Sequence, residues 1–240
     1  METERSCWVV RVWLPDRPGA LGAVASRIGA VRGDVIAIDV LERGGGRAVD
    51  ELTVALADPE LIDLLAAEIG QVDGVDVEDV RPAGGPGTDR AVTAVRAAGR
   101  ITGVETIHEL LESACSETLA LFGADWVVLL DVGAAEHAAV AGLDPPPAAW
   151  LTAFVLGISG DEFGGPASNP RRMVEDLATS RIGSLDMTMV LSRMRLPLRA
   201  VEREVLDELA LLIGGRASQL APAGLARPSK TMGLITERSA

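Results

Sequence analysis

The stretch at residues 8–21, WVVRVWLPDRPGAL, decides the fold of the first third of this chain, because an extended apolar run turns there directly into a helix. Alternation of apolar residues up to Leu14 predicts a β-strand. Pro18 has a preset φ that suits the first turn of a helix, and Gly19 lets the backbone approach a guest closely. The N–H groups of residues 19–21 then lie at the positive end of the helix dipole, which suits a carboxylate or a phosphate. The alternative is a connecting turn that binds only water.

Two helices and three further strands are predicted up to residue 81. Apolar residues recur at helical spacing over residues 21–31. Alternating runs at 36–41 and 48–56 flank a glycine-rich turn and predict a hairpin. In the second run, Asp50 occupies one of the alternate positions that are otherwise apolar. Asp58 and the proline after it mark the start of another helix, which a last strand follows. This order is that of the ferredoxin-like βαββαβ unit, with both helices on one face of a four-stranded antiparallel sheet.

The order of elements and two short motifs resemble the ACT domain, a small regulatory module that senses amino acids. The motifs are DRPGAL at residues 16–21 and GDVI at 33–36, and the resemblance covers about residues 7–81. It implies that the chain binds a free amino acid or a related metabolite. The implied ligand-binding residues are Asp16, Arg17, Pro18, Gly19, Ala20, Leu21, Asp34, Val35 and Ile36.

Both motifs carry an aspartate where the ACT family often has asparagine, namely Asp16 and Asp34. An ionised carboxylate accepts hydrogen bonds but cannot donate them, so it favours an ammonium or guanidinium group over a second anion. We therefore expect the ligand's carboxylate at the N–H groups of residues 19–21 and its cationic group at Asp16 or Asp34. The alternative for Asp34 is a solvated residue at the start of a strand.

Residues 82–90 contain two prolines, three glycines and no apolar pattern, which predicts a mobile linker across which few contacts run. The predicted domains are therefore 1–81, an ACT-like amino-acid-binding domain, and 91–240. In the second domain we expect helices around residues 104–118, 150–158 and 201–220, strands at 126–131, 136–143 and 187–192, and a surface loop at 160–166.

The order of elements over about residues 100–221 resembles the GAF domain, another small-molecule sensing fold. The resemblance depends mostly on the strands at 126–131 and 187–192 and on the long final helix. No residue there marks a cofactor, and none is expected. The predicted fold class is α+β, a ferredoxin-like domain followed by a GAF-like α/β domain.

Composition excludes several classes of protein. A net charge of −13 and a single lysine, Lys230, argue against nucleic-acid binding, because phosphate recognition needs clustered basic residues. No signal peptide and no membrane span are predicted, so we expect a cytoplasmic protein without membrane contact. Cys7 and Cys115 lack metal or disulfide spacing and are expected to be buried reduced thiols.

No catalytic constellation is evident. His108 and His137 lack metal-ligand spacing, and surface or satisfied histidines are the favoured interpretation, so no metal site is expected. The sequence therefore predicts a regulatory protein without enzymatic activity that senses a free amino acid or related metabolite. The alternative is a regulatory or structural subunit of a larger enzyme that binds no small molecule itself.

A homodimer is also expected, with the ligand bound where two N-terminal domains meet. The helices of a ferredoxin-like sheet cover only one face, and an exposed apolar face marks an interface. We expect the helix-covered face to hold Val12, Ile36 and Ile38. The open face is expected to carry Trp8, Trp13, Val35 and Leu41. The alternative is that the second half, or its long helix, covers the open face within one chain.

Overall fold

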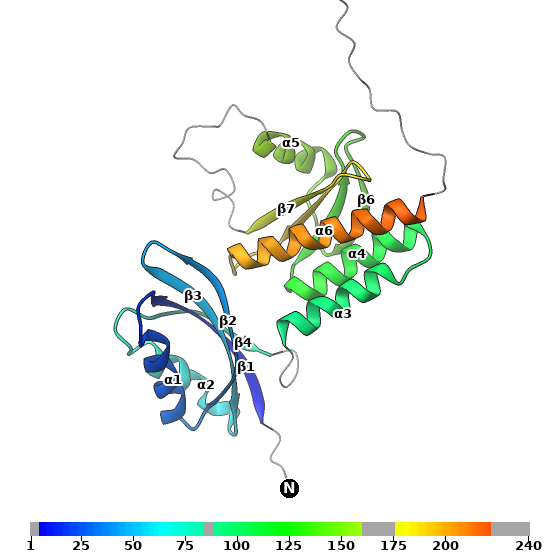
Figure 1. Cartoon of the computed structure of the whole chain (residues 1–240). Coiled ribbons are helices and arrows are strands. Elements are labelled where there is room, and N and C mark those ends of the chain that lie inside the picture. The colour runs from blue at the N-terminus through cyan, green and yellow to red at the C-terminus, as the bar shows by residue number, and fades with distance from the viewer. Residues whose placement is uncertain (1–4, 84–88, 160–175, 222–240) are drawn as a thin grey trace, which may run out of the picture.

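The computed structural model describes residues 5–83, 89–159 and 176–221. In these residues the chain forms two antiparallel four-stranded sheets with helices packed on them, an α+β architecture (Figure 1). The sheets belong to two units, one on each side of the predicted linker. No helix of the described part is long and apolar enough to cross a membrane.

The N-terminal unit has the predicted ferredoxin-like topology. Its elements are β1 (Ser6–Pro15), α1 (Ala20–Ala30), β2 (Asp34–Gly44), β3 (Arg47–Leu56), α2 (Ile62–Ile69) and β4 (Asp76–Pro82). The sheet order is β2-β3-β1-β4, with β1 central and β2 at an edge. A short 3-10 turn, Pro59–Leu61, precedes α2, and the Asp58 side chain caps it by accepting from the Glu60 N–H at 2.9 Å. Both helices lie on one face of the sheet (Figure 1).

The core of this unit lies between the sheet and its helices. Val10, Val12 and Leu14 of β1 pack there on the apolar faces of α1 and α2, which include Val24, Ile28, Leu65 and Ile69. These residues alternate along β1 as predicted, so the strand presents one apolar face to the helices.

The predicted division of the sheet faces is partly wrong. Trp8 and Val35 pack against the helix-covered core. Ile38 lies opposite Leu52 and so keeps its predicted face although it is 42% exposed, whereas Ile36, which is 43% exposed, lies at a register shift. Trp8 has the same parity as the buried valines of β1, so it shares their face. Strand β2 lies at the sheet edge and has register shifts after Val35 and after Val40, which break its simple alternation.

The C-terminal unit is a sheet between two helical layers. Its elements are α3 (Arg90–Thr102), α4 (Ile107–Phe122), β5 (Trp126–Asp131), β6 (Glu136–Gly142), α5 (Ala148–Ser159), β7 (Leu177–Ile182), β8 (Met187–Ser192) and α6 (Ala200–Leu220). The sheet order is β6-β5-β8-β7. Alternate residues of β5 point to opposite layers: Val127 and Leu129 pack with α3, α4 and α6, and Val128 and Leu130 pack with α5.

Most elements of this unit agree with prediction, but α3 and β7 were not predicted. Helix α3 carries Arg90, Arg96 and Arg100, and only Ala97 and Ile101 of its apolar side chains are buried. Strand β7 is short and mixes polar with apolar residues. The predicted loop at 160–166 lies outside the described residues.

The two units touch through the sheet face that α1 and α2 leave uncovered. The N-terminal end of α6 lies beside β2 and β3 (Figure 1), and α6 contacts β2. Arg11 of β1 is fully buried, and Trp13 is half-buried beneath Arg199. The expectation of few contacts across the linker is therefore wrong, and much of the open face is covered within one chain.

Candidate functional site

The turn between β1 and α1 is fixed to the β2–β3 hairpin. The Asp16 N–H donates to the carbonyl oxygen of Gly46 at 2.9 Å, and the Arg17 N–H donates to that of Pro15 at 2.8 Å. Gly19 is the N-cap of α1, with φ of 89°, a left-handed conformation that favours glycine. The turn motif found in the sequence is thus a tight connection that places the start of α1 beside the hairpin.

The N-terminus of α1 has no side-chain cap and no acidic residue in its first turn. Ala20 uses its N–H in a 3.3 Å hydrogen bond to the carbonyl oxygen of Arg17. Within the described chain, the N–H groups of Gly19, Leu21 and Gly22 have no acceptor. Two of the three predicted N–H groups are therefore free, and Gly22 adds another at the positive end of the helix dipole.

A cavity of about 310 Å³ adjoins this helix start. It is lined by Arg17, Gly19, Ala20, Ala23, Arg27, Gln71, Val72 and Asp73. Arg27 forms a 3.0 Å ion pair with Glu68, whereas Arg17 has no partner in the described part of the chain. The cavity presents one basic group from the turn, one from α1 and a carboxylate from the loop after α2, so both ends of a zwitterion find a complementary charge there.

The second motif lies at the other end of the sheet within one chain. Asp34 pairs in register with Ala55, which pairs with Cys7 of β1, nine residues before Asp16. At about 3.3 Å per residue this separation is about 30 Å. The Asp34 side chain is 69% exposed and lies 3.5 Å from Arg5. Asp34, Val35 and Ile36 therefore share no single-chain pocket with the turn, and a site made from both motifs requires two chains.

Asp50 is an unexpected acidic group near the turn. It lies on β3 and is only 3% exposed, yet its carboxylate has no hydrogen bond or ion pair in the described chain. Burial raises the pKa of Asp50; Arg43 lowers it, and the charge of Asp16 raises it further. Asp50 is therefore an unsatisfied buried carboxylate, an expensive state for a charged group.

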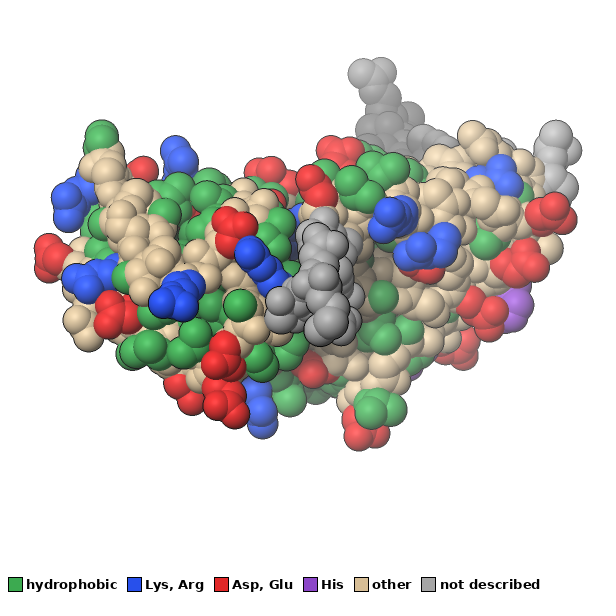
Figure 2. Space-filling view, turned by 90° about the horizontal axis from the view of Figure 1, so that it is seen from below, with side chains coloured by type: hydrophobic (Ala, Val, Ile, Leu, Met, Phe, Trp, Pro, Cys, Tyr) green, Lys and Arg blue, Asp and Glu red, His purple; other side chains and the backbone are tan. Residues whose placement is uncertain are grey.

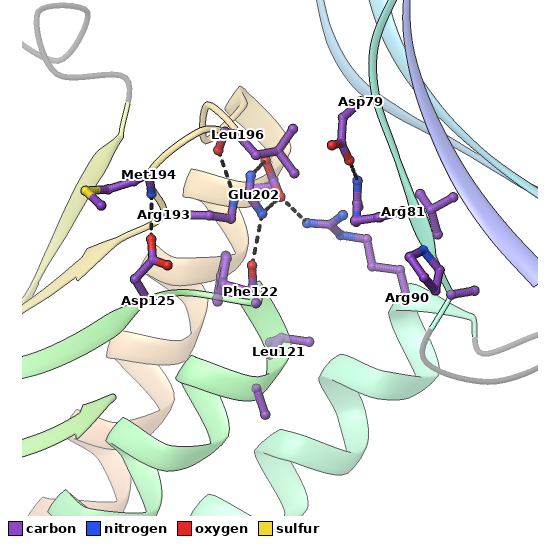
Figure 3. Close-up of a pocket in the computed structure, with 15 residues that line it drawn as sticks. Asp79, Arg81, Arg90, Leu121, Phe122, Asp125, Arg193, Met194, Leu196 and Glu202 are labelled. Carbon is purple, nitrogen blue, oxygen red and sulfur yellow. Dashed lines mark hydrogen bonds and ion pairs between the residues drawn. The ribbon is translucent and has the colours of Figure 1, made fainter. Parts of the chain in front are cut away.

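A second set of charged residues joins the two units, and Figure 3 shows its members Arg90, Arg193 and Glu202. Glu202, in the first turn of α6, accepts from Arg193 with both carboxylate oxygens at 2.8 Å and from Arg90 at 3.0 Å. Arg11 of β1 lies 3.4 Å from Glu202 and 2.7 Å from Glu51 of β3. Because these five residues come from both sides of the linker, they form an interdomain ion cluster.

The cluster lowers the pKa values of its carboxylates. Burial alone would raise the pKa of Glu202, but hydrogen bonds and charge from Arg193, with the charges of Arg11 and Arg90, lower it to about 2. For Glu51, burial likewise opposes ionisation, and Arg11 and Arg81 lower its pKa. Both carboxylates are thus held ionised by the arginines around them.

Trp13 and Arg199 extend the interdomain contact. The Arg199 guanidinium lies 4.7 Å from the centre of the Trp13 ring, and Arg199 also forms ion pairs with Glu78 and, at 3.8 Å, with Glu42. The Trp13 indole N–H donates to Glu78 at 3.0 Å. A desolvated cation over an aromatic ring adds to the ion pairs that hold α6 against the sheet.

A cavity of about 510 Å³ lies beside the ion cluster, between the units. Its lining includes Arg81 and Arg90 at one side and Phe122, Asp125 and Met194 at the other (Figure 3). The Asp125 carboxylate accepts from the Met194 N–H at 2.7 Å, and Arg81 bonds Asp79 at 2.7 Å. The charges are already paired, so the cavity offers no uncompensated group for a ligand. On the surface shown in Figure 2, basic side chains are interspersed with acidic ones.

Metal and thiol chemistry have little support in the described residues, where no group of three or more histidine, cysteine or acidic side chains is placed to hold a metal ion. Both cysteines are free thiols. Cys115 is buried as predicted, and burial raises its pKa to about 12, which keeps it protonated and unreactive. Cys7 is only half-buried.

No protein-family model matches the chain, and no curated protein matches it. The solved structures with some similarity to this chain include three with low TM-scores. The uncharacterized protein TM1266 from Thermotoga maritima is 21% identical over 33% of this chain and 98% of its own, with a TM-score of 0.27. An unknown protein from Galdieria sulphuraria is 13% identical over 90% of this chain and 94% of its own, with a TM-score of 0.32. Bacteriophytochrome RpBphP3 from R. palustris is 14% identical over 77% of this chain and 48% of its own, with a TM-score of 0.39. The chain spans about half the length of the bacteriophytochrome. At these scores none of them identifies a family for this chain.

The sequence pointed to the turn but missed the ion cluster and the isolation of Asp50. Arg11 occupies a polar position in an alternating strand, and Arg193 simply follows a strand. Charges that meet over such sequence separations leave no local pattern. Asp50 had one usable signal, its place among apolar residues of the same parity in β3.

Proposed function

We propose that this chain is a regulatory protein without enzymatic activity that binds a free amino acid, or a closely related metabolite, at the turn between β1 and α1. The observation that carries the proposal is the uncapped start of α1, whose free N–H groups adjoin a cavity with basic and acidic walls. The α-carboxylate of the ligand accepts from these N–H groups. The resemblance of the first unit to ACT domains, and of the second to GAF domains, supports a sensing role.

Binding at the turn has a physical route to the second unit. The turn continues from β1, and β1 carries Arg11 and Trp13 into the contact with α6. A ligand that binds one arrangement of the two units more tightly shifts the population toward that arrangement. The ion cluster is the element through which the proposed signal passes.

The competing function is that of an interaction subunit that binds no small molecule. A specific observation favours it: an apolar groove between α3 and α6, where Val95 and Leu211 are 71% and 68% exposed. Exposed apolar surface of this kind marks protein contacts.

A thermal-shift screen of the twenty L-amino acids separates these functions. At 100 times its dissociation constant, a ligand adds about 2.7 kcal/mol to the free energy of unfolding. The sensor hypothesis expects a concentration-dependent rise in Tm with at least one amino acid. If none shifts the Tm, the interaction-subunit function is favoured instead.

A homodimer remains part of the proposal, but on a different surface from the one first expected. Edge strand β2 exposes Ile36, Ile38 and Val40, and an uncovered edge offers unpaired backbone groups to another strand. A second copy pairing there brings its Asp34 motif into an interface between N-terminal units. Light scattering checks this: a dimer has twice the 25.0 kDa of one chain, and the monomer mass with ligand binding intact removes the shared site.

A further inference from the structure

We infer that Asp50 and Asp16 form a subsite for the primary ammonium group of the ligand, an inference that rests on the proposed binding of an amino acid at the turn. In this arrangement Asp50 takes, within one chain, the part that the sequence suggested for Asp34. The subsite specifies the class of ligand as a zwitterion with adjacent carboxylate and ammonium groups.

The position of Asp50 supports this assignment. Asp50 lies opposite Val12 of β1 and Val40 of β2, and paired residues of antiparallel strands share a face. Val12 is part of the core under the helices, so the Asp50 side chain also stands on the helix-covered face. The turn that carries Asp16 is bonded to the hairpin at Gly46, four residues before Asp50. The buried carboxylate and the start of α1 therefore lie at the same end of the same face.

The energetics also favour a cation beside Asp50. A carboxylate that is 3% exposed and has no partner is costly to keep ionised. The charged groups that act on it are Arg43, an exposed residue near the end of β2, and Asp16 in the turn. An ammonium group has three N–H donors on a compact charge, so it can pair with both carboxylates at once. The free N–H groups of Leu21 and Gly22 then donate hydrogen bonds to the carboxylate of the same ligand.

The subsite is tested directly with ethylammonium chloride as the probe. We expect backbone amide NMR signals of Asp16 and Asp50 in the full chain to shift saturably with ethylammonium and not with sodium chloride at equal ionic strength. Asp50→Asn should abolish the response, and Asp63→Asn, the matched control at an exposed position on α2, should retain it. A cooperative melt of both variants checks that they fold. Absence of a saturable shift, or the same shift in Asp50→Asn, overturns the subsite.

A second measurement separates this inference from the proposed function. For any amino acid that raises the Tm, titration calorimetry should show at least tenfold weaker binding to Asp50→Asn and unchanged binding to Asp63→Asn. The 2-hydroxy acid analogue, which has no ammonium group, should bind both variants alike. Equal affinity of the amino acid for wild type and Asp50→Asn overturns the subsite and leaves the sensor function standing. If no amino acid binds while the ethylammonium response persists, the sensor function falls and the cation subsite is supported.

Discussion

Glu202 and Arg11 lie 3.4 Å apart, carboxylate to guanidinium, although 191 positions separate them in the chain. Both side chains are fully buried, so neither charge is solvated by water. A buried ion pair is stable only when its remaining hydrogen-bonding groups are also satisfied. Here Arg193 and Arg90 donate to Glu202, and Arg11 donates to Glu51. The ion cluster therefore stabilises this arrangement of the two units, because its buried charges are costly to separate.

Glu202→Gln should destabilise the whole chain strongly. The substitution keeps the shape of the side chain but removes the charge that balances three arginines, leaving buried cations uncompensated. We expect a loss of about 3–5 kcal/mol in the free energy of unfolding, measured by urea denaturation. Glu208→Gln, an exposed position on the same helix, is the control and should stay within about 0.5 kcal/mol of wild type. Equal effects of the two substitutions would show that the cluster does not stabilise the fold.

The same carboxylate predicts a pH dependence. Because the folded-state pKa of Glu202 lies at about 2, below its ordinary 4.5, its contribution is fully present above pH 4.5. The contribution is lost as the pH falls from 4.5 to 2, by about 3 kcal/mol. The difference in unfolding free energy between wild type and Glu202→Gln should therefore shrink over this range. A difference that stays constant from pH 7 to pH 2.5 would contradict the assigned pKa.

The N-terminal unit should fold by itself as residues 1–84. Its core is supplied entirely by its own strands and helices, so removal of the second unit leaves that core intact. Arg11 loses Glu202 and the carbonyl oxygen of Pro197 but keeps Glu51. We expect a cooperative melt by circular dichroism at a lower temperature than in the full chain. A fragment without a cooperative transition would mean that the sheet needs the second unit.

The sequence predicted the elements of the N-terminal unit because each has a local signal. The period change at Pro18, the glycine-rich hairpin and the Asp58 cap are all decided within a few residues. The sheet faces were predicted less well, since the register shifts in β2 depend on its partner strand. Helix α3 was missed because only two of its side chains, Ala97 and Ile101, are buried. It packs against α4 and α6.

The candidate site shows the same division between local and distant information. The turn was predicted from its own residues, whereas the left-handed conformation of Gly19 was found only in the structure. The carboxylate near Asp16 was not, because Asp50 comes from another strand and Asp34 had the stronger local motif. Which two charges meet depends on strand order and register, and a single strand carries neither.

Asp50→Asn should stabilise the protein without ligand. It removes an unpaired buried charge, and we expect a gain on the order of 1–3 kcal/mol in unfolding free energy at pH 7. The pKa of Asp50 is raised above 3.8 in the folded state, so wild type loses stability as the pH rises through that raised pKa. The gain should accordingly vanish near pH 3.5. Asp34→Asn, at an exposed position, should change stability by less than about 0.5 kcal/mol at either pH. A destabilised Asp50→Asn would indicate that the carboxylate has a partner in solution.

Gly22→Asp should fill the anion site at the start of α1 with a carboxylate of the protein's own. Nothing lies within 4 Å of a Cβ atom added at Gly22, and the new side chain reaches the free N–H groups of the first turn. Replacing a helical glycine and placing a negative charge there should raise the unfolding free energy by about 1 kcal/mol.

Gly29→Asp is the matched control, because it adds the same charge in equally open space near the other end of the helix. There the dipole opposes a carboxylate, so Gly29→Asp should be less stable than Gly22→Asp. In titrations with an amino acid identified by the screen, Gly22→Asp should bind at least tenfold more weakly and Gly29→Asp should bind as wild type does. Unchanged binding to Gly22→Asp would show that the helix start does not hold the ligand's carboxylate, whatever else the turn does.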